Sequence, residues 1–438
     1  MSKRNFILLI IVLIIVLAVI FGFLFLNKPA TNTTGGTTGT NFFSQFSPFG
    51  TKKTTTPPVV TPPVNVSGYQ PPVTANIKLK KVSSMPIAGY TVFGEERLKA
   101  IPATPTPTPP STKKTTKTPA PLTELVSALR YVARATGNIY ETFADNISEK
   151  QFSSTVIPKV YDAYFGNKGQ SVAMRYLQAD GKTIETFLGA LPKEPLGGNT
   201  GAVNINGSLL PNNTEDVSVS PDSGSMFYLF DSRNDMVGTT VNLTTNKKIQ
   251  IFDSPFTEWL SSWPNNKIIT LTTKPASGIP GYMYEIDQSG KNFNEVLGNI
   301  NGLTTEASPD GKLILYADDN LSLSIYNPTT NLSTLLGVKS LPEKCVWGSA
   351  SDVIYCAVPK SINAGQYPDV WYQGEVSFSD SIWKIDAKTG LATGLLDPVT
   401  APGGGEDIDG VKLMLDSSQN YLFFVNKKDS YLWEFKLN

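Results

Sequence analysis

The chain has 438 residues, 37 Lys and Arg against 37 Asp and Glu, two Cys and no His. Without histidine there is no Ser-His-Asp triad, no Cys-His pair and no HExxH zinc site. Residues 1–120 hold 13 basic and two acidic residues, so residues 121–438 hold 24 basic and 35 acidic ones. This acidic balance argues against a nucleic-acid partner, which needs a basic face.

An uncharged, proline-free hydrophobic run covers residues 6–26. Twenty-one helical residues span roughly 31 Å, about the thickness of a hydrocarbon core. The run predicts a single-pass transmembrane signal anchor at the cell membrane. Lys3 and Arg4 place its N-terminus in the cytoplasm. The rest of the chain is then extracytoplasmic. The alternatives are a cleaved signal peptide and a buried core helix.

Two segments are rich in Thr and Pro. Residues 27–76 are composed largely of Thr, Gly, Pro and Asn, which predicts a disordered tether between residues 1–26 and a domain at 77–438. Residues 104–121 alternate Thr and Pro, which favours an extended rod. Strand-like runs on both sides predict a Pro-rich loop inserted in the domain at about 94–123. The alternative is a second linker, with the domain beginning at Leu122.

A repeat of about 40–70 residues follows, in which alternating apolar segments flank Pro, Asp, Asn and Gly turns. The predicted hairpins cover 161–177, 217–231, 260–273, 306–318, 344–358 and 412–425. Further strands are predicted in 281–297, 323–336, 380–396 and 430–437. One such unit cannot bury its own faces, so the units must stack or close radially.

Two turn patterns resemble those of the TolB-type, Trp-Asp-repeat-like β-propellers. They are the Ser308–Lys312 turn, with its degenerate copy at Ser220–Asp222, and the Ile-Asp pairs at 286–287 and 385–386. The resemblance implies an all-β propeller and leaves the function open. With the hydrophobic run, the chain is also similar to membrane-anchored propellers of reduced-genome bacteria.

Counting the repeats predicts seven blades, with six as the second interpretation because the resemblance favours six. The last unit lacks a strand, and Ile77–Ser83 is a spare one. Strands from both ends of the domain would therefore close the propeller.

Candidate binding residues fall in turns between the second and third strands of a unit. Such turns share one rim of a propeller, here called the upper rim. An inserted loop at 361–379 carries Tyr367, Trp371 and Tyr372, and basic residues occupy the corresponding turns at Arg134, Arg233, Lys274, Lys360 and Lys427. We predict that a partner contacts Arg134, Lys274, Tyr282, Tyr367, Trp371 and Tyr372. The alternatives are an inserted loop that folds back as a buried plug, and solvated turn residues.

No catalytic or cofactor motif stands out. Gly403–Gly410 is acidic and Gly-rich but lacks the bidentate Glu of an EF-hand. It predicts a blade connection, with a weak Ca²⁺ loop at Glu406, Asp407 and Asp409 as the alternative; no other cofactor is expected. The sequence favours a non-catalytic binding or scaffolding propeller for a protein or glycan. The alternative is an envelope enzyme of glycosidase or lyase type that uses paired carboxylates.

The two cysteines, Cys345 and Cys356, lie at equal distances from the predicted turn centre between Ala350 and Ser351. Directly opposed residues on antiparallel strands point to the same face, at a separation near that of a disulfide. We predict a disulfide, which an extracytoplasmic domain can retain. The alternative is a pair of buried free thiols.

Overall fold

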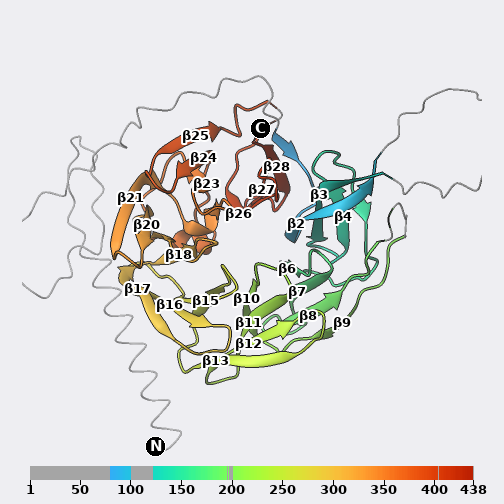
Figure 1. Ribbon diagram of the computed structural model, residues 1–438, viewed down its shortest axis with the longest axis horizontal. Helices are drawn as coiled ribbons and strands as arrows, with labels where there is room; N and C mark the ends of the chain where they lie inside the picture. The colour runs from blue at the N-terminus through green and yellow to red at the C-terminus, as the bar shows by residue number, and fades with distance from the viewer. Residues whose placement is uncertain (1–78, 100–121, 195, 197–200, 403, 438) are drawn as a thin grey trace, which may run out of the picture. The chain divides into compact units, whose positions relative to one another are not determined.

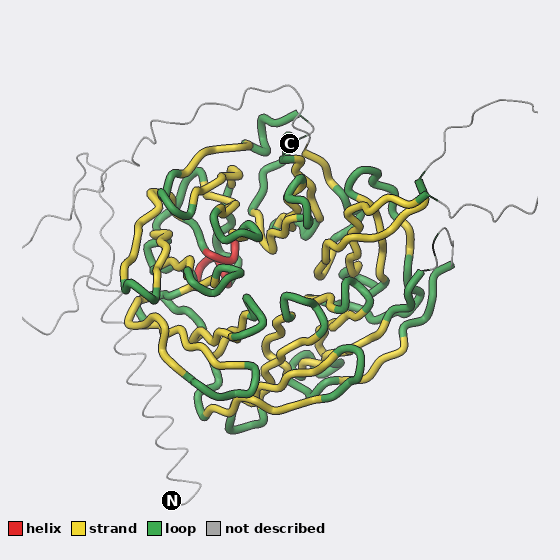
Figure 2. Tube along the Cα trace, viewed as in Figure 1, coloured by secondary structure: helices red, strands yellow, loops and turns green. Residues whose placement is uncertain are grey.

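In the computed structural model, the described residues are 79–99, 122–194, 196, 201–402 and 404–437. They form seven four-stranded antiparallel sheets, which surround a common axis as the blades of a propeller (Figure 1). The described residues also contain a 3-10 turn, η2 (Pro342–Lys344), and one short helix, α2 (Asp369–Tyr372). Strands and loops make up the rest of the described trace (Figure 2).

Each blade contains four strands, named here from the axis outward. The first three blades contain β2 (Ile87–Leu98), β3 (Thr123–Ala133), β4 (Ile139–Phe143) and β5 (Lys150–Gln151); β6 (Asp162–Gly166), β7 (Ser171–Leu177), β8 (Ile184–Ala190) and β9 (Asn206–Leu209); and β10 (Thr214–Val219), β11 (Ser225–Asp231), β12 (Met236–Asn242) and β13 (Lys248–Ser254). The next two contain β14 (Trp259–Ser262), β15 (Ile268–Thr273), β16 (Pro280–Asp287) and β17 (Asn294–Asn301); and β18 (Thr304–Ala307), β19 (Ile314–Ala317), β20 (Ser322–Asn327) and β21 (Leu332–Lys339). The last two contain β22 (Cys345–Trp347), β23 (Val353–Pro359), β24 (Asp380–Asp386) and β25 (Ala392–Leu396); and β26 (Gly410–Leu415), β27 (Tyr421–Asn426), β28 (Leu432–Lys436) and β1 (Leu79–Lys81).

The propeller is closed by strands from both ends of the domain. β1 pairs antiparallel with β28, so that Leu79 lies opposite Phe435 and Lys81 opposite Trp433. The strand from the start of the domain therefore becomes the outermost strand of the seventh blade (Figure 1). Seven blades and closure by both ends are confirmed, and the six-blade interpretation is wrong.

The Ser-Pro-Asp-Gly-Lys turn shows why its residues predicted hairpins. The Ser308 hydroxyl donates to Asp310 at 2.7 Å and accepts from the Leu313 amide at 3.0 Å. Gly311 has a φ of +73°, a conformation that glycine adopts without steric cost. The side-chain bonds fix the turn that joins β18 to β19.

The first hairpin is longer than predicted. β2 runs to Leu98 and pairs with β3 down to Thr123, so residues 94–98 are strand and not part of an inserted loop. At this end of the ladder, Arg97 of β2 also forms an ion pair with Glu124 of β3 at 2.8 Å. The Pro-rich stretch at 104–121 lies outside the described residues.

The core consists of apolar layers between neighbouring blades. One layer joins Phe227 and Leu229 of β11 to Ile269 and Leu271 of β15, and all four side chains are buried. Burying one such side chain fully is worth roughly 1.5–3 kcal/mol. Since every layer takes side chains from two blades, each blade is stabilised by its neighbours.

The predicted anchor at 6–26 and tether at 27–76 also lie outside the described residues. Among the described residues, no helix has the length and apolar character needed to cross a bilayer. The described residues all belong to one unit, Val66–Asn438.

Candidate functional site

The upper rim carries the turns between the second and third strands and the connections from one blade to the next. The five basic residues predicted there are indeed in such turns: Arg134, Arg233, Lys274, Lys360 and Lys427 each follow the second strand of a blade. The strand order that the sequence predicted therefore brings these cations to one rim. Contacts with neighbouring residues determine which of these cations remain available to bind a partner.

The inserted loop at 361–379 is a buried plug and not an exposed binding loop. Trp371, Tyr367 and Phe378 are each at most 3% exposed and pack with Leu321 and Leu341. Figure 2 shows its helix, α2, on the inner side of the ring. The prediction that Trp371 and Tyr367 offer surface to a partner is therefore wrong. Their rings instead bury apolar area against neighbouring blades.

Tyr372 and Tyr282 differ from these buried rings. Tyr372 remains 41% exposed, and its hydroxyl donates to Glu343 at the edge of the plug. Tyr282 lies in strand β16 and its ring packs over Gly298 of β17, where a Cβ would lie 2.3 Å from the ring. Tyr282 is therefore part of a sheet and not of a turn at the rim.

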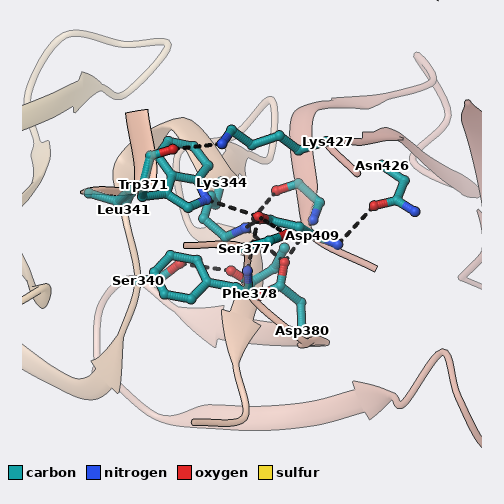
Figure 3. A network of polar contacts seen from close by, with 12 residues as sticks. Ser340, Leu341, Lys344, Trp371, Ser377, Phe378, Asp380, Asp409, Asn426 and Lys427 are labelled. Atoms are coloured by element: carbon teal, nitrogen blue, oxygen red, sulfur yellow. Dashed lines mark hydrogen bonds and ion pairs between the residues drawn. The ribbon is translucent and has the colours of Figure 1, made fainter. Parts of the chain in front are cut away.

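A buried charge network lies beneath the plug (Figure 3). Lys344, at the end of η2, is fully buried and forms ion pairs with Asp380, at 2.8 Å, and with Asp409. Asp409 also accepts hydrogen bonds from the Trp371 indole at 2.9 Å and the Phe378 amide at 3.0 Å. These contacts join the plug to the connections that precede the sixth and seventh blades.

The two carboxylates of the network differ in their pKa values. Burial raises the pKa of Asp380 to about 6 against the lowering effect of Lys344, and one of its oxygens has no partner among the described residues. Burial also disfavours ionised Asp409, but Lys344 and the hydrogen bonds outweigh it and lower its pKa. One lysine therefore stabilises a firmly ionised carboxylate and a second that ionises less readily.

Most upper-rim cations are already engaged within the domain. Lys274 pairs with Glu258 at 2.7 Å, and Lys360 pairs with Asp397. Lys427 donates to the Trp371 carbonyl at 2.6 Å, and burial lowers its pKa. These three lysines hold turns together and are poorly placed to attract a partner.

The two arginines differ from these lysines, because Arg233 and Arg134 are both exposed and form no ion pair with the described residues. Arg134 donates to the Ser430 hydroxyl at 2.9 Å. It lines a pocket of about 510 Å³ on the upper rim, together with Met85, Pro86, Ala133, Ala135, Thr136, Tyr140, Lys159 and Tyr161. Lys159 is likewise exposed and makes no ion pair with the described part of the chain. This pocket is the candidate functional site, and we call it the Arg134 pocket.

The acids of the predicted calcium loop face three different lysines. Glu406 pairs with Lys81 at 2.9 Å, Asp407 with Lys428, and Asp409 with Lys344. Each carboxylate thus has its own cationic partner within the domain.

Carboxylates converge at two other places. Near the axis, Glu306 and Glu343 share a pocket of about 310 Å³, and burial together with the Glu343 charge raises the pKa of Glu306 to about 8. Between the first two blades, Glu95, Glu141 and Glu194 bring one oxygen each within 4.8 Å of one another in a cleft of about 820 Å³. Burial and the Glu141 charge raise the pKa of Glu95 to about 6.

The two cysteines face each other across β22 and β23, in the register that the sequence predicted. Their Cα atoms are 4.0 Å apart and their sulfurs are joined in a disulfide. The bond ties the innermost strand of the sixth blade to its neighbour.

Sequence reasoning missed the residues that matter most at this rim. Lys344 and Asp380 belong to distant segments of the sixth blade and have no local pattern that marks them, and Asp409, singled out only as a possible Ca²⁺ ligand, comes from the connection to the next blade. Lys159 and Tyr161 lie in the connection before β6, and no motif of the sequence singled out either residue as a binding residue. One residue of the pocket was predictable, because the sequence placed Arg134 on this rim.

No family model matches the chain, and no curated protein sequence matches it. Among solved structures, it is similar to TolB from Acinetobacter baumannii, with 15% identity and a TM-score of 0.38 over 59% of each chain. The match thus spans under two thirds of the TolB chain. An oligogalacturonate lyase from Vibrio parahaemolyticus matches with 8% identity and a TM-score of 0.46 over 71% of this chain and 86% of that one. An oligogalacturonate lyase in complex with manganese matches with 9% identity and a TM-score of 0.44, over 71% and 85%. TolB is thus among the structures that this chain resembles, as the Ser-Pro-Asp-Gly-Lys turns predicted.

Proposed function

We propose that this chain is a non-catalytic binding propeller that engages an anionic protein or glycan partner at the Arg134 pocket. The observation that carries the proposal is the pair of exposed cations, Arg134 and Lys159, in a pocket with no carboxylate among its lining residues. Elsewhere on the rim, Lys274, Lys360 and Lys427 have partners within the domain. A cation without an internal partner is available to a ligand.

The charge balance of the chain makes this pocket distinctive. Residues 121–438 carry 35 acidic against 24 basic residues, so this part of the chain has a net negative charge. At physiological salt the field of a charge decays over about 8 Å. The two cations therefore act locally, and they would fix the partner's position on the rim more than they would steer it from afar.

We also propose that residues 6–26 anchor the chain in the cell membrane as a single pass, with the propeller outside. The support is the length and apolar character of that run and the flanking Lys3 and Arg4. Alkaline extraction of membranes tests it: the full chain should stay in the pellet, and a variant lacking 6–26 should be released. A full chain that is extracted as readily as this variant would contradict the anchor.

Partner capture tests the binding role. The full chain is cross-linked in intact envelopes, and the captured partner is compared between the wild type and Arg134→Glu with Lys159→Glu. We expect about a tenfold loss, because reversing a contact charge adds repulsion to the loss of attraction. The matched control is Arg233→Glu, an exposed arginine in the equivalent turn of the third blade. Equal capture by all three proteins would contradict a role for this pocket.

A second candidate function rests on the carboxylates between the first two blades. Glu95 has a raised pKa of about 6, while Glu141 pairs with the buried Arg130 at 2.6 Å. A carboxylic acid with a raised pKa next to a second carboxylate is the pairing that glycoside cleavage uses. This cleft would make the chain a carboxylate-dependent glycosidase or lyase.

Turnover of envelope polysaccharides distinguishes the two functions. If the cleft is catalytic, Glu95→Gln abolishes the activity and Glu375→Gln, a change at an exposed residue outside the cleft, does not. The absence of any turnover by the wild type, or turnover that Glu95→Gln leaves unchanged, would contradict this second function.

A further inference from the structure

The Arg134 pocket is built from three segments of the upper rim. Met85 and Pro86 come from the connection between β1 and β2, Arg134 from the turn after β3, and Lys159 and Tyr161 from the connection before β6. The Arg134 amide donates to the Pro86 carbonyl at 3.0 Å, which joins the first two segments. The Lys159 amide donates to the Ala135 carbonyl at 3.3 Å, which joins the third segment to the second. The pocket is therefore held by backbone bonds and exists without a ligand.

Its lining is apolar apart from the two cations and a few hydroxyls. Met85, Pro86, Ala133 and Ala135 contribute only apolar side chains, and Tyr140 contributes an aromatic one. Its volume of about 510 Å³ lies within the usual range of small-ligand pockets, about 300–1,000 Å³. Such a lining favours a ligand with an apolar body, since a fully polar ligand would lose its hydration there without compensation.

The polar groups of the pocket are hydrogen-bond donors and suit a ligand that carries an acceptor. A guanidinium carries five N–H donors, and the one Arg134 side-chain bond within the described chain goes to Ser430. Two parallel donors remain, which is the geometry that matches a carboxylate.

We infer that the Arg134 pocket binds a carboxylate attached to an apolar group. The inference rests on the proposed function and names the ligand class of the same site. Arg134 holds the carboxylate, Lys159 adds a second positive charge, and the apolar body lies against Met85, Pro86 and the alanines. This chemistry has two sources: a free small carboxylate, or the C-terminal residue of a peptide with an apolar side chain.

Calorimetric titration of the full chain in detergent tests the ligand class. The probes are N-acetyl-phenylalanine and the peptide Gly-Gly-Ala-Phe, each as the free acid and as the C-terminal amide. We expect each acid to bind at least about tenfold more tightly than its amide, because only the acid carries the charge that Arg134 pairs with. Arg134→Gln should remove most of this difference, and Arg233→Gln should preserve it.

The two sources give different results. If the peptide acid binds more tightly than N-acetyl-phenylalanine, the ligand is a chain end; equal affinities indicate a free small carboxylate. Acids and amides that bind equally, or acids that bind equally to the wild type and Arg134→Gln, would overturn the inference.

The experiments distinguish a wrong ligand class from a wrong binding site. If the double charge reversal abolishes partner capture while acids and amides bind equally, the pocket is the partner site and its ligand is not an apolar carboxylate. If the double reversal leaves capture unchanged, the binding role of the pocket fails, whatever the probes do.

Discussion

Lys344 is the residue on which the plug depends most. It is fully buried, pairs with Asp380 and Asp409, and lies 5.3 Å from the ring centres of Trp371 and Phe378. Its charge is the counterion of two carboxylates that have no contact with bulk water. Replacing a buried pair as a whole can be neutral, but removing one partner leaves an uncompensated charge.

We therefore expect Lys344→Met to lower the free energy of unfolding by about 3–5 kcal/mol. Denaturant unfolding measures this, with Lys384→Met at an exposed position of β24 as the control. Adding Asp409→Asn to Lys344→Met should restore part of the loss, because one uncompensated charge is gone. A Lys344→Met protein as stable as the control would show that the network contributes little.

Glu306 gives the domain a dependence on pH. Burial and the neighbouring Glu343 raise its pKa to about 8, so the folded state holds a proton that the unfolded state loses near pH 4.5. Between these two pH values, the folded state binds more protons at Glu306 than the unfolded state does. The free energy of unfolding therefore falls as the pH rises through this range. Below about pH 4.5, Glu306 does not change the free energy of unfolding. Above about pH 8, its destabilising effect has reached its full size.

Glu306→Gln should then match the wild type near pH 4 and be more stable than it at pH 9. Melting curves across this range measure the difference. The exposed Glu375→Gln should show no such trend. A Glu306→Gln protein whose difference from the wild type does not grow with pH would contradict the raised pKa.

At the scale of elements, β1 is a strand of only three residues that completes the seventh blade. Leu79 is buried against the layer that contains Trp433 and Phe435. Without β1, the N–H and C=O groups of β28 would be exposed as an unpaired edge.

Leu79→Asp should therefore lower the free energy of unfolding by more than about 2 kcal/mol and promote aggregation, since it buries a charge where an apolar side chain packed. Unfolding and light scattering measure both effects. The control is Lys436→Thr, at the exposed end of the neighbouring strand β28. If Leu79→Asp melts and remains soluble like Lys436→Thr, closure by β1 is not important for stability.

The disulfide joins β22 to β23 across 11 residues. Closing so short a loop stabilises the fold by about 2–3 kcal/mol in the chain-entropy model. Denatured, unreduced protein should show no reactive thiol, and reduction should lower the unfolding midpoint. Two reactive thiols before reduction would show that the cysteines are free.

The elements themselves were largely predictable, because alternating strands and Pro-Asp-Gly turns are local properties of the sequence. The Cys345–Cys356 register follows from the turn centre alone, and it matches the observed pairing. The plug was not predictable as buried, because its burial depends on Leu321, Leu341 and Val411, which come from different blades. A loop sequence rich in aromatic residues fits an exposed binding loop and a buried plug equally well.

At the scale of the whole molecule, the packing of neighbouring blades creates what no single blade contains. It brings the connection before β2, the turn after β3 and the connection before β6 together around the Arg134 pocket. It also brings Lys344, 65 residues from Asp409, into contact with it. The sequence predicted Arg134 on this rim, but the selection of Arg134 over Lys274 required the ion pair of Lys274 with Glu258.

Photo-cross-linking at a single position tests most directly whether the upper rim is the partner surface. Benzoylphenylalanine is introduced into the full chain at Ala135, an exposed residue of the Arg134 pocket, and separately at Leu332, an exposed residue of the outer strand β21. After irradiation of intact cells, we expect a discrete adduct from position 135 and none from position 332. An adduct from position 332 without one from position 135 would contradict binding at the upper rim.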